Sequence, residues 1–257
     1  MVEEHQPYRV TVGPEVQLPS GLIVMCTELT GEDQEDLTYQ RTMDQYARSL
    51  NRVMARRVSV AGKTVEPSWV ENLLSGDRVA ILYHLRRLSL GDDWRFECKC
   101  PNANCSRYKK KFPAFASFDD ESVKISPYPH GELRRIEVSV FDKGIVRKIE
   151  ISLLTGVEER QVVKANQNVG LTTMLQVRRP VEVIEREDGE SERKGLDLKR
   201  ESLGFLQSLV STVSENEPDI TDVYVSVNCP ECDTEILIDP LGDPSFLFPA
   251  SSGRTST

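Results

Sequence analysis

Five of the six cysteines lie in two short segments that are far apart in the sequence; they are Cys98, Cys100, Cys105, Cys229 and Cys232. In each segment a run of β-prone residues leads into Cys-Pro, and another cysteine follows. This pattern predicts a turn that directs two thiolates at one point. A tetrahedral zinc ion needs four such soft ligands, so neither segment can complete a site alone. We therefore expect the two segments to meet and to share one zinc ion.

The predicted ligands are Cys100, Cys105, Cys229 and Cys232. The second pair has the two-residue spacer of a zinc knuckle, whereas four residues separate the first pair. Cys98 lies on the same side of its strand as Cys100, so it could replace a ligand or lie beside the site. Four thiolates leave no open coordination position, which makes the predicted zinc structural and not catalytic. The alternative is a set of free buried thiols, or a disulfide in one pair.

The elements that position these cysteines follow one order in both halves of the chain. Each half has a β-prone run that ends in Leu-Thr-Gly, and an acidic residue follows. Thr30 with Asp33, and Thr155 with Glu158, have the spacing of a helix N-cap and its third helical residue. Both strands are therefore predicted to lead directly into a helix.

Each half then predicts a helix, a hairpin, a second helix and a strand that enters the cysteine turn. The hairpins are expected at 58–65 and 181–189, and Ser68 with Glu71 predicts a capping box for the second helix of the first half. The distance from the glycine to the Cys-Pro turn is 69 residues in one half and 73 in the other. This similarity indicates an internal duplication, and the alternative is a chance likeness of two α+β stretches.

The predicted fold class is α+β, with two duplicated strand–helix–hairpin–helix–strand halves joined by a shared pair of zinc knuckles. The expected parts are an N-terminal arm or edge strand at 1–17, a first half at 18–105, an irregular crossing segment at 106–143, a second half at 144–248 and a disordered tail at 249–257. Phe246, Leu247 and Phe248 are too apolar to remain in solvent, so they should dock on this protein or on a partner.

The composition indicates a soluble globular protein in a reducing compartment. The 257 residues carry a net charge of −9, which argues against a general affinity for nucleic acid. Clustered cysteines are more typical of metal binding than of a disulfide framework, and Cys26 is interpreted as a buried apolar residue. No apolar run approaches the roughly 20 residues of a membrane span, and the N-terminus does not resemble a secretory signal.

The sequence offers little for catalysis. His130-Gly-Glu132 matches part of a zinc deaminase motif, but Asn228 stands where that motif has proline before its first cysteine. No Gly-x-Ser-x-Gly element or glycine-rich phosphate loop is present, and His84 fits the surface or packing of a helix. The segment 107–112 interleaves basic and aromatic residues beside the first cysteine turn, which could bind nucleic acid or could be a solvated loop.

Taken in order, several segments resemble the baseplate (hub) protein family of contractile-tailed, T-even-like phages and related contractile injection systems. They are Leu18-Pro19-Ser20-Gly21, Leu29-Thr30-Gly31-Glu32, 74–78, 85–91, 96–105, 153–156, Cys229-Pro-Glu-Cys232 and 246–248. The longer spacer between Cys100 and Cys105 departs from the Cys-Pro-x-Cys turns of that family. The order of the segments, and no single motif, carries this resemblance.

The resemblance implies a structural subunit of a virion tail baseplate, made in the host cytoplasm, and not an enzyme. Its expected partners are other hub proteins, the tail tube or the spike, within a large hetero-oligomer and without nucleic acid or membrane. Two alternatives remain: a zinc-ribbon module that binds nucleic acid, and a tail assembly chaperone that is absent from the mature particle.

Overall fold

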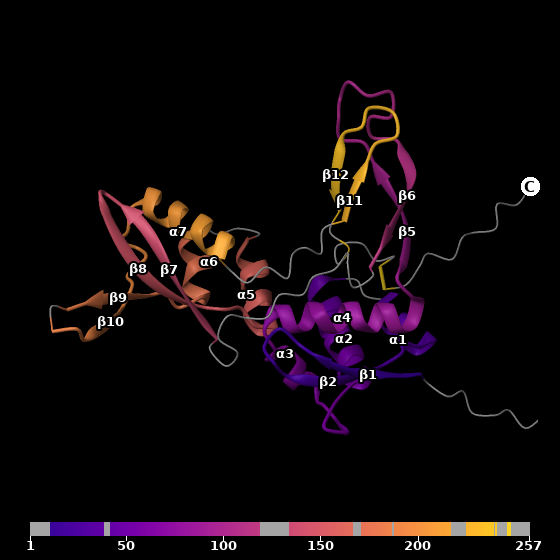
Figure 1. The fold of residues 1–257 in the computed structure, drawn as a ribbon, viewed down its shortest axis with the longest axis horizontal. Helices are drawn as coiled ribbons and strands as arrows, with labels where there is room; N and C mark the ends of the chain where they lie inside the picture. Colours follow the sequence, from indigo (N-terminus) through magenta and orange to yellow (C-terminus); the bar gives the residue numbers. More distant parts are fainter. Residues whose placement is uncertain are drawn as a thin grey trace, which may run out of the picture.

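The computed structural model describes residues 11–38, 42–118, 134–166, 171–186, 188–216, 225–238, 240 and 246–247. Helices and strands both occur in both halves of the chain, which confirms the α+β class. The elements form three modules (Figure 1). We call β1 to α4 the first unit, β7 to α7 the second unit, and the projection formed by β5, β6, β11 and β12 the ribbon.

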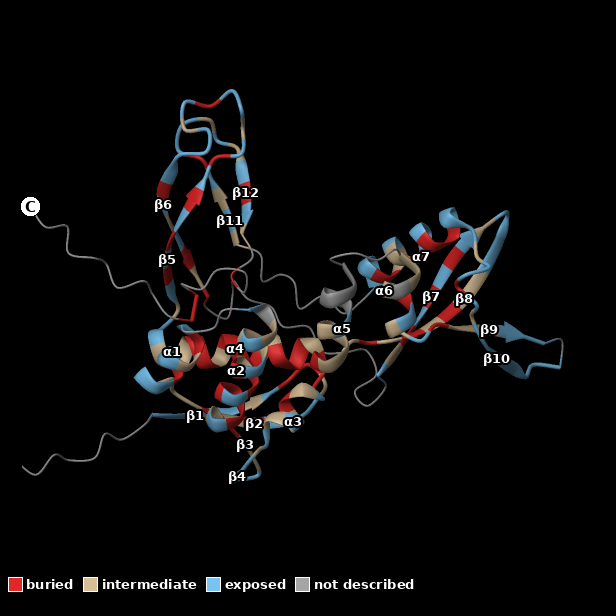
Figure 2. Cartoon of the chain, turned by 180° about the vertical axis from the view of Figure 1, so that it is seen from behind, coloured by how far each residue is buried: buried red, intermediate tan, exposed pale blue. Residues whose placement is uncertain are grey.

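The first unit is a four-stranded antiparallel sheet with four helices. The strands, in the order β1-β2-β3-β4, are β1 (Val12–Gln17), β2 (Ile23–Thr27), β3 (Val58–Val60) and β4 (Lys63–Thr64). The helices are α1 (Gly31–Thr38), α2 (Met43–Arg57), α3 (Pro67–Glu71) and α4 (Ser75–Leu90). Buried residues concentrate on α2 and α4 (Figure 2), with Met54, Ile81 and Leu85 fully enclosed. The core of the unit thus lies between these helices and the sheet.

The second unit has the same kinds of secondary-structure elements, and they follow one another along the chain in nearly the same order. Its sheet order is β10-β9-β8-β7, with β7 (Arg135–Asp142), β8 (Ile145–Ser152), β9 (Val181–Glu185) and β10 (Ser191–Gly195). Its helices are α5 (Gly156–Asn166), α6 (Leu171–Val177) and α7 (Leu203–Asn216). Val140 on β7, Ile149 on β8 and Leu209 on α7 have no exposed surface and belong to a second, separate core.

Both predicted helix entries are confirmed. Asp33 accepts hydrogen bonds from the backbone N–H and the hydroxyl of Thr30, at 2.9 and 3.3 Å. Glu158 accepts the same two bonds from Thr155, at 3.0 and 3.1 Å. In both cases the hydroxyl donates to the carboxylate, and the acid caps the backbone N–H of the threonine. Each strand is therefore locked to the following helix by one acidic side chain.

The two predicted hairpins are also present. β3 and β4 are joined at Ala61 and Gly62, whose φ values are 48° and 75°, and the β9–β10 connection contains Gly189 at φ 83°. Positive φ at these positions matches the right-handed twist of the strands, which explains the glycines.

The predicted helix that starts with a Ser68–Glu71 capping box is wrong. The N-cap of α3 is Glu66, with proline at the first helical position, and α3 ends at Glu71 before α4 begins at Ser75. The Glu71 carboxylate instead accepts a hydrogen bond from Asn51 at 3.2 Å and pairs with Arg160 at 3.0 Å. The Glu71 carboxylate therefore binds residues that are distant in the sequence and does not cap the helix.

The break between α3 and α4 is where the two units meet. Leu74 forms an isolated antiparallel bridge with Thr155. The backbone N–H of Ser75 donates to the carbonyl of Leu154 at 2.8 Å, and that of Gly156 donates to the carbonyl of Leu73 at 3.3 Å. The starts of α4 and α5 are therefore held together by main-chain hydrogen bonds.

Arg78 fills the space beside this junction. Its guanidinium pairs with Glu159 of the second unit and donates to Asn51 Oδ1 at 3.0 Å. A Cβ atom at Gly156 would lie 2.7 Å from the guanidinium carbon of Arg78. Position 156 therefore has no space for a side chain unless Arg78 moves.

The module boundaries differ from the predicted ones. Residues 12–17 form the edge strand β1, one of the two readings offered for 1–17. The segment 106–143 contains two regular strands, β6 (Lys111–Ser117) and β7, so the second unit begins before Gly144. The tail at 249–257 lies outside the described residues, as do 1–10.

Phe246 and Leu247 pack on this chain, which is the first of the two alternatives predicted for this segment, and they are not exposed for docking on a partner. Phe246 is 1% exposed and its ring lies 5.1–5.8 Å from those of Tyr83, Trp94 and Phe118. Leu247 is also buried, and Phe248 lies outside the described residues. This aromatic cluster fixes the base of the ribbon to the first unit. No described helix is both long and apolar enough to cross a bilayer.

Candidate metal centre

The ribbon is built from two hairpins that come from opposite halves of the chain. β5 (Asp93–Lys99) pairs with β6, and β11 (Val225–Asn228) pairs with β12 (Glu235–Ile238), both antiparallel. The cysteine turns join the two strands of each hairpin at the same end of the ribbon (Figure 1). Because the strands of each hairpin are paired along their length, the two cysteine turns lie beside each other at the end of the ribbon.

Cys100, Cys105, Cys229 and Cys232 come together at that end, with all four sulfurs within 4.8 Å of one another. The Sγ atoms of Cys100 and Cys232 are 3.6 Å apart, and those of Cys105 and Cys229 are 3.7 Å apart. A tetrahedron with metal–sulfur bonds of about 2.3 Å has sulfur–sulfur edges of about 3.8 Å. The spacing thus fits a metal ion, and it is too long for disulfides, whose S–S distance is about 2.05 Å.

The longer first turn still forms a closed loop. Lys109 donates its backbone N–H to the carbonyl of Cys100 at 3.0 Å, and Tyr108 donates to that of Cys105 at 2.9 Å. The backbone N–H of Arg107 donates to the sulfur of Cys105 at 3.3 Å. The four-residue spacer therefore does not separate the two sulfurs. The hydrogen bond from Arg107 lowers the pKa of Cys105, but burial and the hydrogen bonds with Cys232 and Cys229 outweigh it, so this pKa is raised.

The second turn has the compact geometry expected of a knuckle. Asp233 donates its N–H to the carbonyl of Cys229 at 2.9 Å, and Cys229 donates to the carbonyl of Thr234 at 3.0 Å. Asp233 has a φ of 54°, which lets the chain reverse just after Cys232. Both sulfurs of this pair consequently face the first turn.

Thr234 connects the two turns and acts on one ligand. Its hydroxyl lies 3.1 Å from the sulfur of Cys232 and accepts a hydrogen bond from Asn102 at 3.2 Å. A thiolate at Cys232 can only accept, so the hydroxyl of Thr234 donates to it in that form. The hydrogen bonds from the side chain and the backbone of Thr234 lower the pKa of Cys232 to about 6. One of the four sulfurs is therefore prepared as a thiolate at neutral pH.

Burial acts in the opposite direction on Cys100. This side chain is 1% exposed, and burial raises the pKa of its thiol to about 12. A buried set of four thiolates would concentrate negative charge in a site that excludes water. A divalent cation removes that cost, which is why such clusters are typical of metal centres.

Cys98 is not part of the four-sulfur group. It is buried in the ribbon. Burial, and to a smaller extent the nearby Cys229, raises the pKa of its thiol. The possibility that Cys98 replaces a ligand is therefore not supported by the geometry. Cys26 lies in the first-unit core, as expected, and burial raises its pKa to about 12.

The basic segment beside the first turn is partly neutralised within the ribbon. Arg107 pairs with Glu231 across the two turns at 3.1 Å, and Lys111 pairs with Glu97 at 2.6 Å. The ammonium of Lys109 lies 4.9 Å from the ring centre of Tyr108. These exposed pairs contribute little to stability, but they reduce the positive charge available to a nucleic acid.

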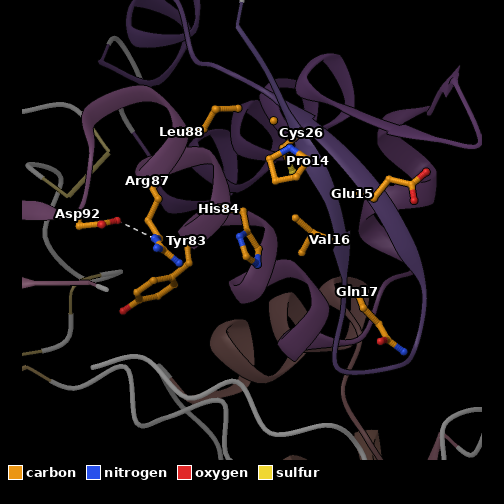
Figure 3. A pocket seen from close by; sticks show the side chains of 11 residues that line it. Pro14, Glu15, Val16, Gln17, Cys26, Tyr83, His84, Arg87, Leu88 and Asp92 are labelled. Atoms are coloured by element: carbon orange, nitrogen blue, oxygen red, sulfur yellow. Dashed lines mark hydrogen bonds and ion pairs between the residues drawn. The ribbon is translucent and has the colours of Figure 1, made fainter. Parts of the chain in front are cut away.

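His84 is not part of the four-sulfur group. His5 and the His130-Gly-Glu132 motif lie outside the described residues. His84 lies on α4, where it lines a groove against β1 (Figure 3). The sequence analysis did not find this groove, because it depends on how far the edge strand stands from the helix.

No protein-family model matches this chain, and comparisons with curated proteins and with solved structures find no match either. The interpretation of the cysteine cluster therefore depends on its geometry.

Proposed function

We propose that the chain is a structural zinc protein that serves as a subunit of a contractile tail baseplate hub. The observation that carries the zinc assignment is the convergence of four sulfurs within 4.8 Å from two hairpins of opposite halves. Thiolate ligands in a tetrahedral arrangement favour zinc, and four of them leave no position for a substrate. Cys100, Cys105, Cys229 and Cys232 would hold the ion.

The ion would supply stability that the ribbon lacks by itself. Isolated two-stranded hairpins are marginally stable in water, and the ribbon consists of two of them. Structural zinc contributes about 10–16 kcal/mol of apparent binding free energy in zinc-finger peptides at pH 7. Zinc would therefore turn two weak hairpins into one rigid projection.

We also propose that the two units arose by duplication. In both, a Leu-Thr-Gly turn is capped by an acid, and an Arg-Arg pair precedes the next hairpin. Arg57 pairs with Asp33 at 2.6 Å, and Arg179 lies 3.7 Å from Glu158. In each unit, therefore, an acidic residue and an arginine at equivalent positions lie close together. Each half was predicted to end in a strand and its cysteine turn. The cysteine hairpins instead form a separate ribbon and do not complete the two units.

The baseplate role rests on the ordered resemblance described above and on the architecture of the chain. Two rigid units and a metal-bound projection offer several surfaces in fixed relation, as a subunit within a large hetero-oligomer requires. Its partners would be other hub proteins, the tail tube or the spike. The protein would be made in the host cytoplasm and reside in the virion tail baseplate.

The decisive experiment replaces Cys229 and Cys232 by serine in a genome that encodes this chain. Particle assembly should fail, because the ribbon would lose its metal, whereas Cys98→Ala should leave it intact. Contractile particles of normal yield from the double serine variant would refute the role.

Mass spectrometry of purified tails distinguishes a resident subunit from an assembly chaperone. Salt-sensitive oligonucleotide binding by the purified chain would favour the nucleic-acid alternative.

A further inference from the structure

The β7–β8 hairpin carries an apolar tip that faces solvent. Phe141, Ile145 and Val146 are 68%, 66% and 60% exposed, and they lie within six residues of one another. Figure 2 shows this tip as an exposed projection of the second unit. Single exposed apolar residues are common, but three large ones at the end of one hairpin are typical of a contact surface.

The tip is a regular hairpin whose strand pairing continues to the turn. Lys143 and Gly144 form a two-residue turn with φ values of 49° and 86°, and the strand register continues to the pair Asp142–Ile145. Behind the tip, Arg147 pairs with Glu182 at 2.7 Å and with Glu201 at 2.8 Å. A preorganised apolar projection loses little conformational entropy when it enters a pocket.

A groove of about 600 Å³ lies between the edge strand β1 and α4. Figure 3 shows Val16 and Gln17 on the strand side and His84 and Arg87 on the helix side. Pro14, Val16 and Leu88 supply apolar side chains to the groove, and the polar side chains of its lining are Glu15, Gln17, His84, Arg87 and Asp92. Its volume is within the range of about 300–1,000 Å³ that is usual for binding pockets. In the second unit, by contrast, α7 packs directly on β7.

We propose that the β7–β8 tip of one chain inserts into the β1–α4 groove of a second copy. The β7–β8 hairpin belongs to the second unit, and β1 and α4 belong to the first unit on the other side of the molecule (Figure 1), so one chain cannot make this contact with itself. A contact between different surfaces of identical chains is heterologous, and it produces a ring if the rotation closes. This self-association depends on neither the zinc nor the baseplate proposal.

Charge at the two surfaces favours this occupant. Lys143 is exposed at the end of the tip, and Glu15 is exposed at the rim of the groove. An ion pair between them would fix the orientation of the inserted hairpin. Opposite charges at a contact favour the matching partner, whereas like charges there are costly. The contact area is small, so we expect weak association that a closed ring would strengthen.

Sedimentation velocity of the zinc-loaded full chain over a range of concentrations tests the proposal. The weight-average mass should rise with concentration, and Phe141→Asp should weaken association by about tenfold or more. Phe115→Asp is the matched control, because Phe115 is 54% exposed on the ribbon and should not affect the mass. All substituted positions are exposed, so loss of folding is not expected, and circular dichroism checks it.

A charge exchange gives the stricter test. Lys143→Glu alone and Glu15→Lys alone should each remain monomeric, because each places like charges at the contact. An equal mixture of these two variants should associate again, and so should the chain that carries both substitutions. The proposal is overturned if the wild type stays monomeric at all soluble concentrations, if Phe141→Asp associates normally, or if the mixture shows no recovery.

Discussion

The sulfur atoms of Cys105 and Cys229 lie 3.7 Å apart, although 124 residues separate them in the chain. This contact predicts one metal ion per chain, bound by both halves together. Replacing Cys229 and Cys232 by serine should abolish metal binding and lower the stability of the ribbon, because the two remaining thiols cannot hold zinc tightly. Elemental analysis of the purified protein measures the metal. Cys98→Ala should retain a full equivalent, and loss of metal in that variant would place Cys98 among the ligands.

The affinity for zinc should depend on pH in two stages. Between pH 9 and 6 it should fall as pH decreases, because Cys100, with a pKa of about 12, and Cys105, whose pKa is also raised, must each release a proton for each ion bound. Below about pH 6 the fall should become steeper, because Cys232, with a pKa of about 6, then also binds a proton that zinc must displace. Competition with a chromogenic chelator at several pH values measures this slope. An affinity that does not change with pH would contradict thiolate ligation.

Gly156→Ala should destabilise the junction between the units. The new methyl group would lie 2.7 Å from the guanidinium of Arg78, which is held in place by Glu159 and Asn51. Displacing it should cost about 1–3 kcal/mol in the free energy of unfolding. Gly204→Ala is the control, because no atom lies within 4 Å of its new Cβ. Chemical denaturation compares the two, and equal stabilities would argue against the close packing.

Asp33→Asn should destabilise the protein more than Glu158→Gln, although the two residues hold equivalent positions. Asp33 is fully buried and pairs with Arg56 at 3.0 Å and with Arg57 at 2.6 Å. Removing its charge leaves a largely buried guanidinium unpaired, at a cost of about 3 kcal/mol. Arg179, the partner of Glu158, is 76% exposed, so its loss should cost little. Denaturant midpoints measure this order, and the reverse order would refute it.

Phe246→Ala should destabilise the first unit by about 3–5 kcal/mol. The ring is enclosed by Tyr83, Trp94 and Phe118, and its removal would leave a cavity among them. Phe115→Ala, at an exposed position, should change the stability by less than about 0.5 kcal/mol. Thermal unfolding followed by tryptophan fluorescence reports on this cluster directly, because Trp94 belongs to it.

The sequence predicted the features that depend on local chemistry. The acid caps at Thr30 and Thr155 and the glycine turns of the hairpins follow from residue types at short spacing. The meeting of the two cysteine pairs was predicted because zinc needs four ligands and each turn supplies two. The spacer between Cys100 and Cys105 was harder to interpret, because it is the Tyr108 and Lys109 hydrogen bonds that close the turn.

The features that sequence reasoning missed depend on distant contacts. The Ser68–Glu71 cap was expected, but Asn51 and Arg160 take the Glu71 side chain. The break before α4 exists because Leu74 pairs with Thr155 of the other unit. For Phe246 the sequence left docking on this chain or on a partner open, because no local pattern reveals that the aromatic cluster of the first unit encloses it.

The long separation between the two cysteine turns also has a consequence for synthesis. At a translation rate of about 5–20 residues per second, the 124 residues from position 106 to Cys229 take roughly 6–25 s to appear. During that interval the first unit can already be folded, whereas Cys229 and Cys232 have not yet been synthesised and cannot join the thiols of Cys100 and Cys105. A nascent chain therefore passes through a stage in which half of the sulfur set is open to oxidation or to the wrong metal.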